Sequence, residues 1–367
     1  MEHIENDEIY KGLSVSKGIP QPPPVSEDAI EAFKKKKRKQ YTASEFIQGI
    51  LVGNRIVLSQ AITLVESALT EHQLIAQEVI EKCLPYSGNS IRIGITGVPG
   101  VGKSSFIETL GTQITGSGRK LAVLAIDPSS ERSKGSILGD KTRMEELSID
   151  KNAYIRPSPS SGSLGGVARK TRESMILCEA AGFDTIFIET VGVGQSETAV
   201  HSMVDFFLLL MLAGAGDELQ GIKRGIMEMA DAIVITKADG TNHTKTKLAQ
   251  TQYQSALHLF PLSKSRWTPR VLTCSALNKT GIIEIWEMIL EYIQATKTNN
   301  FFDNKRFDQA AYWMHETIAE TLKNNFYSNT EIKKQINDIE KQVCANNLTS
   351  FVAAKMLLDS YFRKNNI

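Results

Sequence analysis

A phosphate-loop motif constrains this chain more than any other feature of its sequence. Residues 97–104 read Gly-Val-Pro-Gly-Val-Gly-Lys-Ser and match the pattern G-x-x-x-x-G-K-[ST]. The apolar run Ile91–Thr96 before the motif is typical of a buried strand, and residues 105–110 after it have helical character. A glycine-rich loop between a strand and a helix is the context in which this motif binds a nucleotide.

Each part of the motif has its own role in phosphate binding. Glycine permits the backbone turns that aim N–H groups at phosphate oxygens, and the start of the helix adds its partial positive charge. We expect Lys103 to reach the β- and γ-phosphates and the Ser104 hydroxyl to hold Mg²⁺. The predicted phosphate-binding residues are Gly97, Val98, Pro99, Gly100, Val101, Gly102, Lys103, Ser104 and Ser105.

Two later segments favour guanine over adenine as the base. Residues 236–239, Thr-Lys-Ala-Asp, follow a predicted strand and approximate the N-K-x-D element of GTPases, whose carboxylate accepts hydrogen bonds from guanine. Thr236 departs from that pattern, because its short hydroxyl stands where an amide is usual. Residues 275–277 match the element whose backbone N–H groups approach guanine O6. The predicted guanine-binding residues are Lys237, Asp239, Ser275, Ala276 and Leu277.

Carboxylates near strand ends are candidates for a metal site beside the phosphates. Glu189 begins Glu-Thr-Val-Gly, where GTPases have D-x-x-G, and we expect it to hold Mg²⁺ through a water. The N–H of Gly192 is expected at the γ-phosphate. Asp127 ends another predicted strand and Asp140 follows it, so the predicted metal-binding set is Ser104, Asp127, Asp140 and Glu189.

Strands and helices alternate after the phosphate loop, which predicts an α/β phosphate-loop NTPase with a mostly parallel sheet. Most of the strand candidates are continuous apolar runs, as expected for strands covered on both faces. The predicted strands are Ile91–Thr96, Leu121–Ile126, Asp184–Glu189, Phe206–Met211, Ala232–Thr236 and Arg270–Thr273.

The chain is expected to divide into four regions: an irregular basic and proline-containing arm (1–41), an N-terminal helical segment (42–88), the GTPase domain (89–298) and a C-terminal helical dimerisation segment (299–367). The helical pattern from Thr42 carries an apolar stripe to Val65, and a second helix is expected at Glu71–Cys83. The C-terminal helices are predicted at Phe307–Phe326, Glu331–Cys344 and Leu348–Phe362.

Composition excludes several classes of protein. The 367 residues, 41% hydrophobic and 23% charged, are those of a globular chain that can build a core. A net charge of +1 gives no reason to expect a nucleic-acid partner, and the longest apolar run, Phe206–Ala213, is too short to span a bilayer. Four scattered cysteines without a C-x-x-C indicate a reducing compartment, and the acidic N-terminus resembles no export signal, so we expect a cytoplasmic protein.

Taken together, these segments resemble the MeaB family of GTPases, which includes the methylmalonic aciduria type A protein and proteins labelled ArgK. The resemblance extends over about residues 94 to 277. The matching segments are GITGVPGVGKSS, AIDPSS, GDKTRM, RPSPSSGSLGGVA, ETVGVGQSE, AGAGDELQGIKRGIMEMAD, TKADG and TCSAL.

The resemblance implies a GTP-hydrolysing chaperone of adenosylcobalamin-dependent methylmalonyl-CoA mutase, which gates loading, protection or reactivation of that cofactor. It implies binding of GTP or GDP with Mg²⁺, a homodimer, and switch regions at Asp127–Arg143, Glu189–Glu197 and Gly214–Arg224. Lys223 matches a residue that couples partner binding to hydrolysis, so the expected catalytic set is Lys103, Glu189 and Lys223. Intrinsic turnover should be slow, because Gln195 is a poor match to a water-orienting glutamine.

Two other functions stay open at this point. A phosphate-loop kinase acting on an amino-acid transport component would share the motif, although the guanine-type segments disfavour it. A nickel metallochaperone GTPase would need a cluster of His and Cys ligands, which the sequence does not contain. Neither a nucleic-acid nor a membrane partner is expected.

Overall fold

The computed structural model describes residues 41–127, 144–159, 164–190, 196–214 and 224–364. The chain falls into two units, Met1–Tyr41 and Thr42–Ile367. All but the last residue of the first unit lies outside the described part of the chain, so the second unit is described here by itself.

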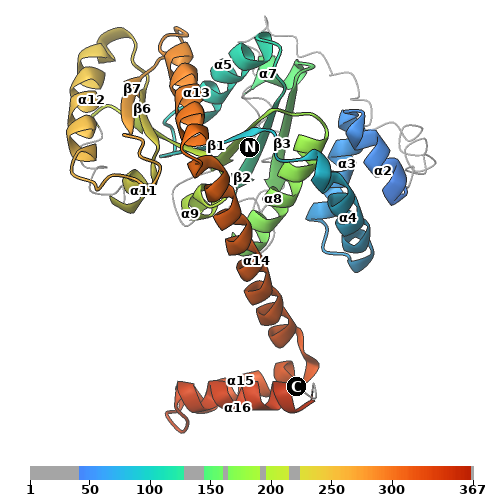
Figure 1. Ribbon diagram of the computed structural model, residues 1–367. Coiled ribbons are helices and arrows are strands. Elements are labelled where there is room, and N and C mark those ends of the chain that lie inside the picture. Colours follow the sequence, from blue (N-terminus) through green and yellow to red (C-terminus); the bar gives the residue numbers. More distant parts are fainter. Residues whose placement is uncertain (1–40, 128–143, 160–163, 191–195, 215–223, 365–367) are drawn as a thin grey trace, which may run out of the picture. The chain divides into compact units, whose positions relative to one another are not determined.

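A seven-stranded parallel sheet forms the centre of this unit, in the order β3-β2-β4-β1-β5-β6-β7 (Figure 1). Its strands are β1 Ile91–Gly97, β2 Leu121–Asp127, β3 Ala153–Pro159, β4 Thr185–Thr190, β5 Phe206–Leu212, β6 Ala232–Thr236 and β7 Arg270–Thr273. Both faces are covered, since Leu208 and Leu210 of β5 join one apolar cluster while Leu209 and Met211 join another. The predicted α/β fold with a parallel sheet is therefore confirmed.

Strand β3 was missed by the sequence prediction because it contains Pro157 and Pro159. Proline has no backbone N–H, so a run with two prolines argues against a central strand. The structure places β3 at the edge of the sheet, where β2 is its only partner among the described strands, from Leu121↔Ala153 onward. An edge strand needs no ladder bonds on its outer side, which explains why these prolines are tolerated.

The N-terminal helical segment contains one more helix than predicted. The stripe expected from Thr42 to Val65 is divided into α2 (Ala43–Leu51) and α3 (Arg55–Glu66). Gly53 takes a φ of +75° between them, and the Asn54 side chain caps α3 by accepting from two backbone N–H groups. The second helix, α4 (Thr70–Cys83), lies where it was predicted.

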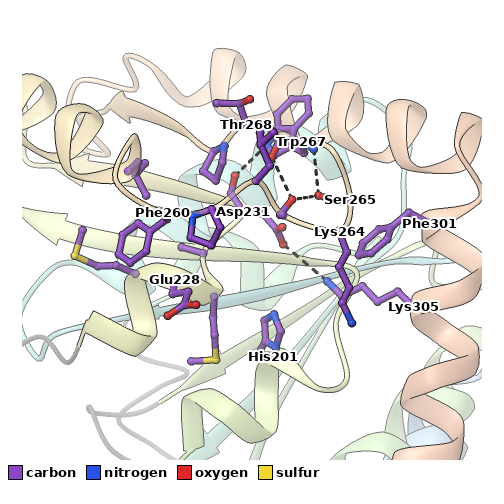
Figure 2. Close-up of a pocket in the computed structure, with 18 of the residues that line it drawn as sticks. His201, Glu228, Asp231, Phe260, Lys264, Ser265, Trp267, Thr268, Phe301 and Lys305 are labelled. Atoms are coloured by element: carbon purple, nitrogen blue, oxygen red, sulfur yellow. Dashed lines mark hydrogen bonds and ion pairs between the residues drawn. The ribbon is translucent and has the colours of Figure 1, made fainter.

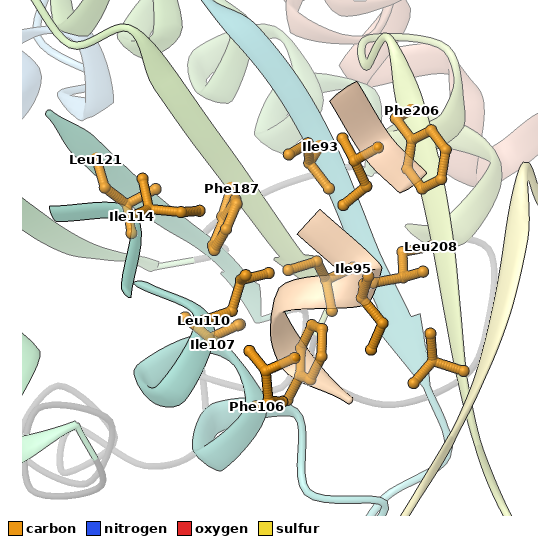
Figure 3. Close-up of a cluster of buried hydrophobic side chains, with 14 of the residues drawn as sticks. Ile93, Ile95, Phe106, Ile107, Leu110, Ile114, Leu121, Phe187, Phe206 and Leu208 are labelled. Atoms are coloured by element: carbon orange, nitrogen blue, oxygen red, sulfur yellow. The ribbon is translucent and has the colours of Figure 1, made fainter. Parts of the chain in front are cut away.

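The remaining helices before the C-terminal region connect the strands. They are α5 Lys103–Gly116, α7 Glu145–Ile149, α8 Leu164–Ala180, α9 Ser196–His201, α11 Arg224–Met229, α12 His243–Leu257 and α13 Ile282–Thr298. A large apolar cluster lies between the sheet, α5 and α13, and Figure 3 shows Ile93, Ile95 and Phe106 packed within it. This packing fixes α5, and with it the loop that precedes α5, against the centre of the sheet.

The C-terminal region consists of α14 (Phe301–Ser328), α15 (Thr330–Cys344) and α16 (Ser350–Lys364). Arg306 attaches the beginning of α14 to the amino-terminal edge of the sheet. Its guanidinium donates to both carboxylate oxygens of Asp205, at 2.8 and 2.7 Å, and to the carbonyl oxygen of Ser90 at 2.6 Å. Helices α15 and α16 pack together around a small cluster of their own, Ile332, Ile339, Ala353 and Leu357.

The position of Ile93 at the centre of the sheet predicts a large stability effect. Ile93 is fully buried in β1, and truncation to Ala should lower the free energy of unfolding by about 2–5 kcal/mol through lost burial and a cavity. The matched control is Ile56→Ala, since Ile56 is 69% exposed and its change should stay within about 0.5 kcal/mol. Urea unfolding measures both, and equal losses in the two variants would contradict the packing described above.

Candidate functional site

The phosphate loop joins the carboxyl end of β1 to α5. Gly97 is the last residue of β1, residues 98–102 form the loop, and Lys103, Ser104 and Ser105 lie in the first turn of α5. Gly97 is required by space, because a Cβ atom there would lie 2.5 Å from the carbonyl oxygen of Leu210 in β5. Gly102 is required by conformation, since it enters the helix with a φ of +95°.

The Lys103 ammonium is folded back over the loop. Its Nζ donates to the carbonyl oxygen of Gly97 at 2.7 Å and to that of Val98 at 3.4 Å. Burial lowers the pKa of Lys103, and the negative charges of Glu189 and Glu197 act in the opposite direction. The cation is thus held inside the loop, with two carboxylates near enough to favour its charged form.

Glu189 lies next to the phosphate-loop strand, at the carboxyl end of β4. It pairs in register with Ile95 of β1, and its side chain is buried. The next residue, Thr190, shares a hydrogen bond of 2.8 Å between its hydroxyl and that of Thr96, the residue before the loop. The segment that begins at Glu189 is therefore tied to the start of the phosphate loop, and the half-buried Ser104 lies beside Lys103 in the first turn of α5.

Other predicted residues are placed only in part. Asp127 is the last residue of β2, so its backbone lies at the same edge of the sheet as Gly97 and Glu189. Asp140, Gly192 and Lys223 lie outside the described residues, as do Gln195 and most of the three expected switch regions.

The two segments predicted to bind guanine, residues 236–239 and 275–277, contact each other. The Ser275 hydroxyl donates to Asp239 Oδ2 at 2.5 Å, and the N–H of Ala238 donates to the carbonyl oxygen of Cys274 at 3.0 Å. The carbonyl oxygen of Ala276 accepts from Thr109 of α5 at 3.4 Å. Leu277 projects outward, 83% exposed. The carboxylate of Asp239 is therefore oriented by the second segment before any base arrives.

Thr236 links this region to the phosphate loop. Its hydroxyl donates to the carbonyl oxygen of Val101 at 2.6 Å and lies 3.3 Å from that of Met211. Lys237 adds a second link, since its Nζ donates to the carbonyl oxygen of Gly100 at 2.8 Å. Lys237 has a φ of +57°, an uncommon backbone conformation for a residue other than glycine. The short threonine hydroxyl reaches the loop despite its departure from the N-K-x-D pattern.

Sequence reasoning did not single out two residues that the structure places at this site. Glu197 in α9 is fully buried and its charge acts on Lys103. The Asn242 amide donates to the carbonyl oxygen of Lys237 at 2.9 Å and so holds the strained backbone there. Glu197 ends the expected switch region Glu189–Glu197, but no role was assigned to its side chain, and Asn242 lies outside every matching segment. Each acts through the folded arrangement of its neighbours.

The described residues contain neither a clustered metal-ligand set nor a membrane-spanning helix. Within those ranges, no group of three or more His, Cys, Asp or Glu side chains could hold a metal ion. Within the same ranges, no helix combines the length and the apolar character needed to cross a membrane.

Comparison with known proteins gives consistent matches over most of the chain. The model of the family described as methylmalonyl Co-A mutase-associated GTPase MeaB matches residues 58–331. A probable GTPase of Mycobacterium tuberculosis is 49% identical over 84% of this chain and 91% of its own length. The GTPase ArgK of Escherichia coli is 48% identical over 80% of this chain and 88% of its own length.

A mouse relative and a solved structure extend these matches. The murine methylmalonic aciduria type A homolog, described as mitochondrial, is 44% identical over 88% of this chain and 80% of its own length. The crystal structure of a protein named LAO/AO transport system kinase superimposes with a TM-score of 0.72 at 39% identity. It covers 89% of this chain and 99% of the other.

The Thr236 link can be tested by removing one hydroxyl. Thr236→Val leaves the Val101 carbonyl oxygen without its described donor, and the loss of a buried hydrogen bond costs about 1–3 kcal/mol. We expect weaker binding of fluorescent guanine nucleotides by roughly tenfold, because the phosphate loop loses its tie to the base-binding strand. Thr236→Ser keeps the hydroxyl and should bind nearly as wild type. Equal affinity of the valine and serine variants would contradict this role.

Proposed function

The chain belongs to the MeaB family of methylmalonyl-CoA mutase-associated GTPases, and from this membership we propose that it is the chaperone of an adenosylcobalamin-dependent methylmalonyl-CoA mutase. In this proposal GTP binding and hydrolysis gate the loading, protection or reactivation of the mutase cofactor. Support comes from the family model and from the murine relative named for methylmalonic aciduria type A.

Nucleotide binding is supported by the hydrogen bonds that join the phosphate loop to the segment 236–239. Thr236 and Lys237 hydrogen-bond to the phosphate loop, and Ser275 orients Asp239. We assign Asp239 to the N1–H and amine of guanine, the Lys237 stem to the ring face, and the backbone of residues 275–277 to guanine O6. Phosphates would then lie on the backbone N–H groups of residues 97–105.

The residues beside Lys103 fit a magnesium ion. Mg²⁺ prefers oxygen ligands and usually keeps several waters, and the hydroxyl of Ser104 and the buried carboxylate of Glu189 supply such oxygens. Asp127 and Asp140 are the further proposed ligands. When bound, the ion would neutralise charge on the phosphates. Lys103 supplies a fixed cation to the same oxygens, and Gly192 is assigned to the γ-phosphate.

The assignment of Asp239 gives a test of base specificity. Asp239→Asn should lose GTP affinity by at least tenfold, since a charged hydrogen bond contributes roughly 1.5–3 kcal/mol. The variant should gain affinity for xanthosine triphosphate, because an amide can donate to the xanthine oxygen. Calorimetry with both nucleotides measures the change in base preference. An Asn variant that still prefers GTP would rule out contact between Asp239 and the base.

Coupling to the partner is tested with purified mutase. Lys223 is the residue we propose to swing a cation toward the γ-phosphate when the mutase binds, and such a cation can raise phosphoryl transfer about a thousandfold or more. Saturating mutase should therefore raise the GTPase rate, and Lys223→Ala should bind GTP normally but lose most of the stimulation. A rate unchanged by mutase, with no complex on gel filtration in any nucleotide state, would reject the chaperone role.

We also assign the C-terminal helices to a homodimer. Helix α14 exposes apolar side chains beyond the part held by Arg306, including Met314, Ile318 and Leu322, and α16 exposes Phe351 at 87%. An apolar surface of this kind is typical of an interface. Light scattering should give a dimer for the wild-type chain.

Two sets of substitutions in α14 test whether its exposed apolar side chains form the dimer interface. Ile318→Glu combined with Leu322→Glu buries two charges if the surface is an interface, which should dissociate the dimer. Lys323→Glu changes a neighbouring exposed residue of the same helix and should leave the dimer intact. A double variant that stays dimeric would move the interface elsewhere.

One specific observation keeps a kinase as second candidate. The solved structure with the TM-score of 0.72 is that of a protein named as a transport-system kinase. Incubation with radiolabelled GTP separates the two functions by product. Free phosphate alone supports a GTPase, whereas label on a protein or amino acid supports a kinase.

A cytoplasmic location is part of the proposal and rests on cysteine chemistry. Cys83, Cys178 and Cys274 are buried free thiols. Burial raises the pKa of Cys83 to about 11 and that of Cys274 to about 12, so both are poor nucleophiles. Fractionation of the source cells checks the location, and recovery with an oxidising compartment would contradict it.

A further inference from the structure

A large cavity lies at the edge of the sheet opposite the phosphate loop. Its volume is about 880 Å³, within the range of sites for small organic molecules. The ends of α9 and α11, the segment 258–269 and helix α14 bound it (Figure 2). Asp231, immediately before β6, lines the cavity and marks this edge as the amino-terminal one.

The ammonium of Lys305 is a largely buried charged group in this cavity, with a side chain that is 14% exposed. Its Nζ donates to the carbonyl oxygen of Asp205 at 2.8 Å, but Asp231 Oδ2 lies 3.9 Å away, beyond hydrogen-bond distance. Asp231 already accepts from the N–H of Phe207 at 2.9 Å, and burial raises its pKa. Lys305 and Asp231 therefore form a long ion pair, but Lys305 makes no hydrogen bond to a carboxylate among the described residues, and an anionic ligand group would supply one.

His201 adds a neutral hydrogen-bonding group beside this ammonium. Burial and the charge of Lys305 lower the pKa of His201 to about 4, so the ring is uncharged near neutral pH. A neutral imidazole offers one N–H donor and one acceptor. Its ring packs edge-on against Phe207, and we find no hydrogen-bond partner for its nitrogens in the described part of the chain.

The walls and rim restrict what kind of anion fits. Phe260 and Trp267 line the cavity together with Phe301, and Figure 2 shows Phe260 on the side opposite Phe301 and Lys305. These aromatic walls favour an apolar ligand body. At the exposed rim, Lys264 is accompanied by the carboxylates of Glu228 and Asp308, which would repel a second negative charge.

Helix α9 connects this cavity with the phosphate loop. Its buried Glu197 acts on the charge of Lys103, and His201 at its other end lines the cavity. Between them Val200 packs directly on β1, since a Cβ atom on Gly94 would lie 2.8 Å from Val200 Cγ1. Because this short helix is so closely packed, a displacement of one end must also move the other end.

We propose that this cavity binds a small organic monoanion with an aromatic or aliphatic body, and that its occupancy changes nucleotide affinity through α9. The site goes beyond the GTPase function, since it shares no residue with the nucleotide site. Ligand and nucleotide would then influence each other by the same factor.

Binding at this cavity is tested by NMR of the full-length protein with ¹³C-labelled methionine methyl groups. The probe ligand is 4-phenylbutyrate. The signals of Met227 and Met229, which line the cavity, should shift, while those of Met175 and Met288, buried elsewhere, should not. The matched cation 4-phenylbutylamine and the dianion 4-phenylbutyl phosphate should bind more weakly. Absence of these shifts, or tighter binding of either control compound, overturns the assignment.

The charge of Lys305 is tested by Lys305→Met against Lys323→Met, an exposed lysine of the same helix. The first variant should bind 4-phenylbutyrate about tenfold more weakly or worse, and the second as wild type. Because Lys305 also bonds to Asp205, neutral 4-phenylbutan-1-ol serves as the folding control and should bind both variants equally. Undiminished 4-phenylbutyrate binding by Lys305→Met overturns the proposal.

Coupling is measured as GDP affinity by calorimetry with and without saturating 4-phenylbutyrate. We expect a change of at least about fivefold, the lower end of typical coupling between sites. The affinity for 4-phenylbutyrate should change by the same factor when GDP is present. An unchanged GDP affinity while the Met227 signal shows a filled cavity overturns the role of α9.

Discussion

The hydrogen bond from the Thr236 hydroxyl to the Val101 carbonyl oxygen is the contact on which the nucleotide site depends. It spans 2.6 Å between the phosphate loop after β1 and the end of β6, two strands that β5 separates in the sheet. Lys237 adds a parallel contact to Gly100. In the proposed site a guanine nucleotide contacts both loops at once, so their fixed separation would let one rigid ligand bind both without first ordering either.

Much of this arrangement follows from local sequence, and the rest from context that no short pattern contains. The phosphate loop and six strands were predictable because glycine spacing and continuous apolar runs are local signals. Strand β3 was not, because Pro157 and Pro159 are acceptable only at a sheet edge, and edge position is a property of the whole sheet. The break at Gly53 was hidden for a related reason, since the apolar stripe continues on both sides of it.

The candidate site shows the same division. Motifs in a fixed order along the chain single out Lys103, Asp239 and Ser275 as candidates. The effect of Glu197 on Lys103 was not foreseen, because it arises from the way α9 packs across β1. Thr236 looked like a weakness in the sequence, yet its hydroxyl makes the link to Val101 directly. Departures from a motif are therefore best judged by the contact that the replacement residue makes.

In the proposed site the two joined loops select a guanine nucleotide. Isothermal titration calorimetry of the wild-type protein with GTP and with ATP measures this selection. We expect tighter binding of GTP by a factor on the order of a hundred or more, because adenine would leave the oriented carboxylate of Asp239 without its donors. Equal affinity for the two nucleotides would contradict the guanine assignment and favour a phosphate-loop kinase.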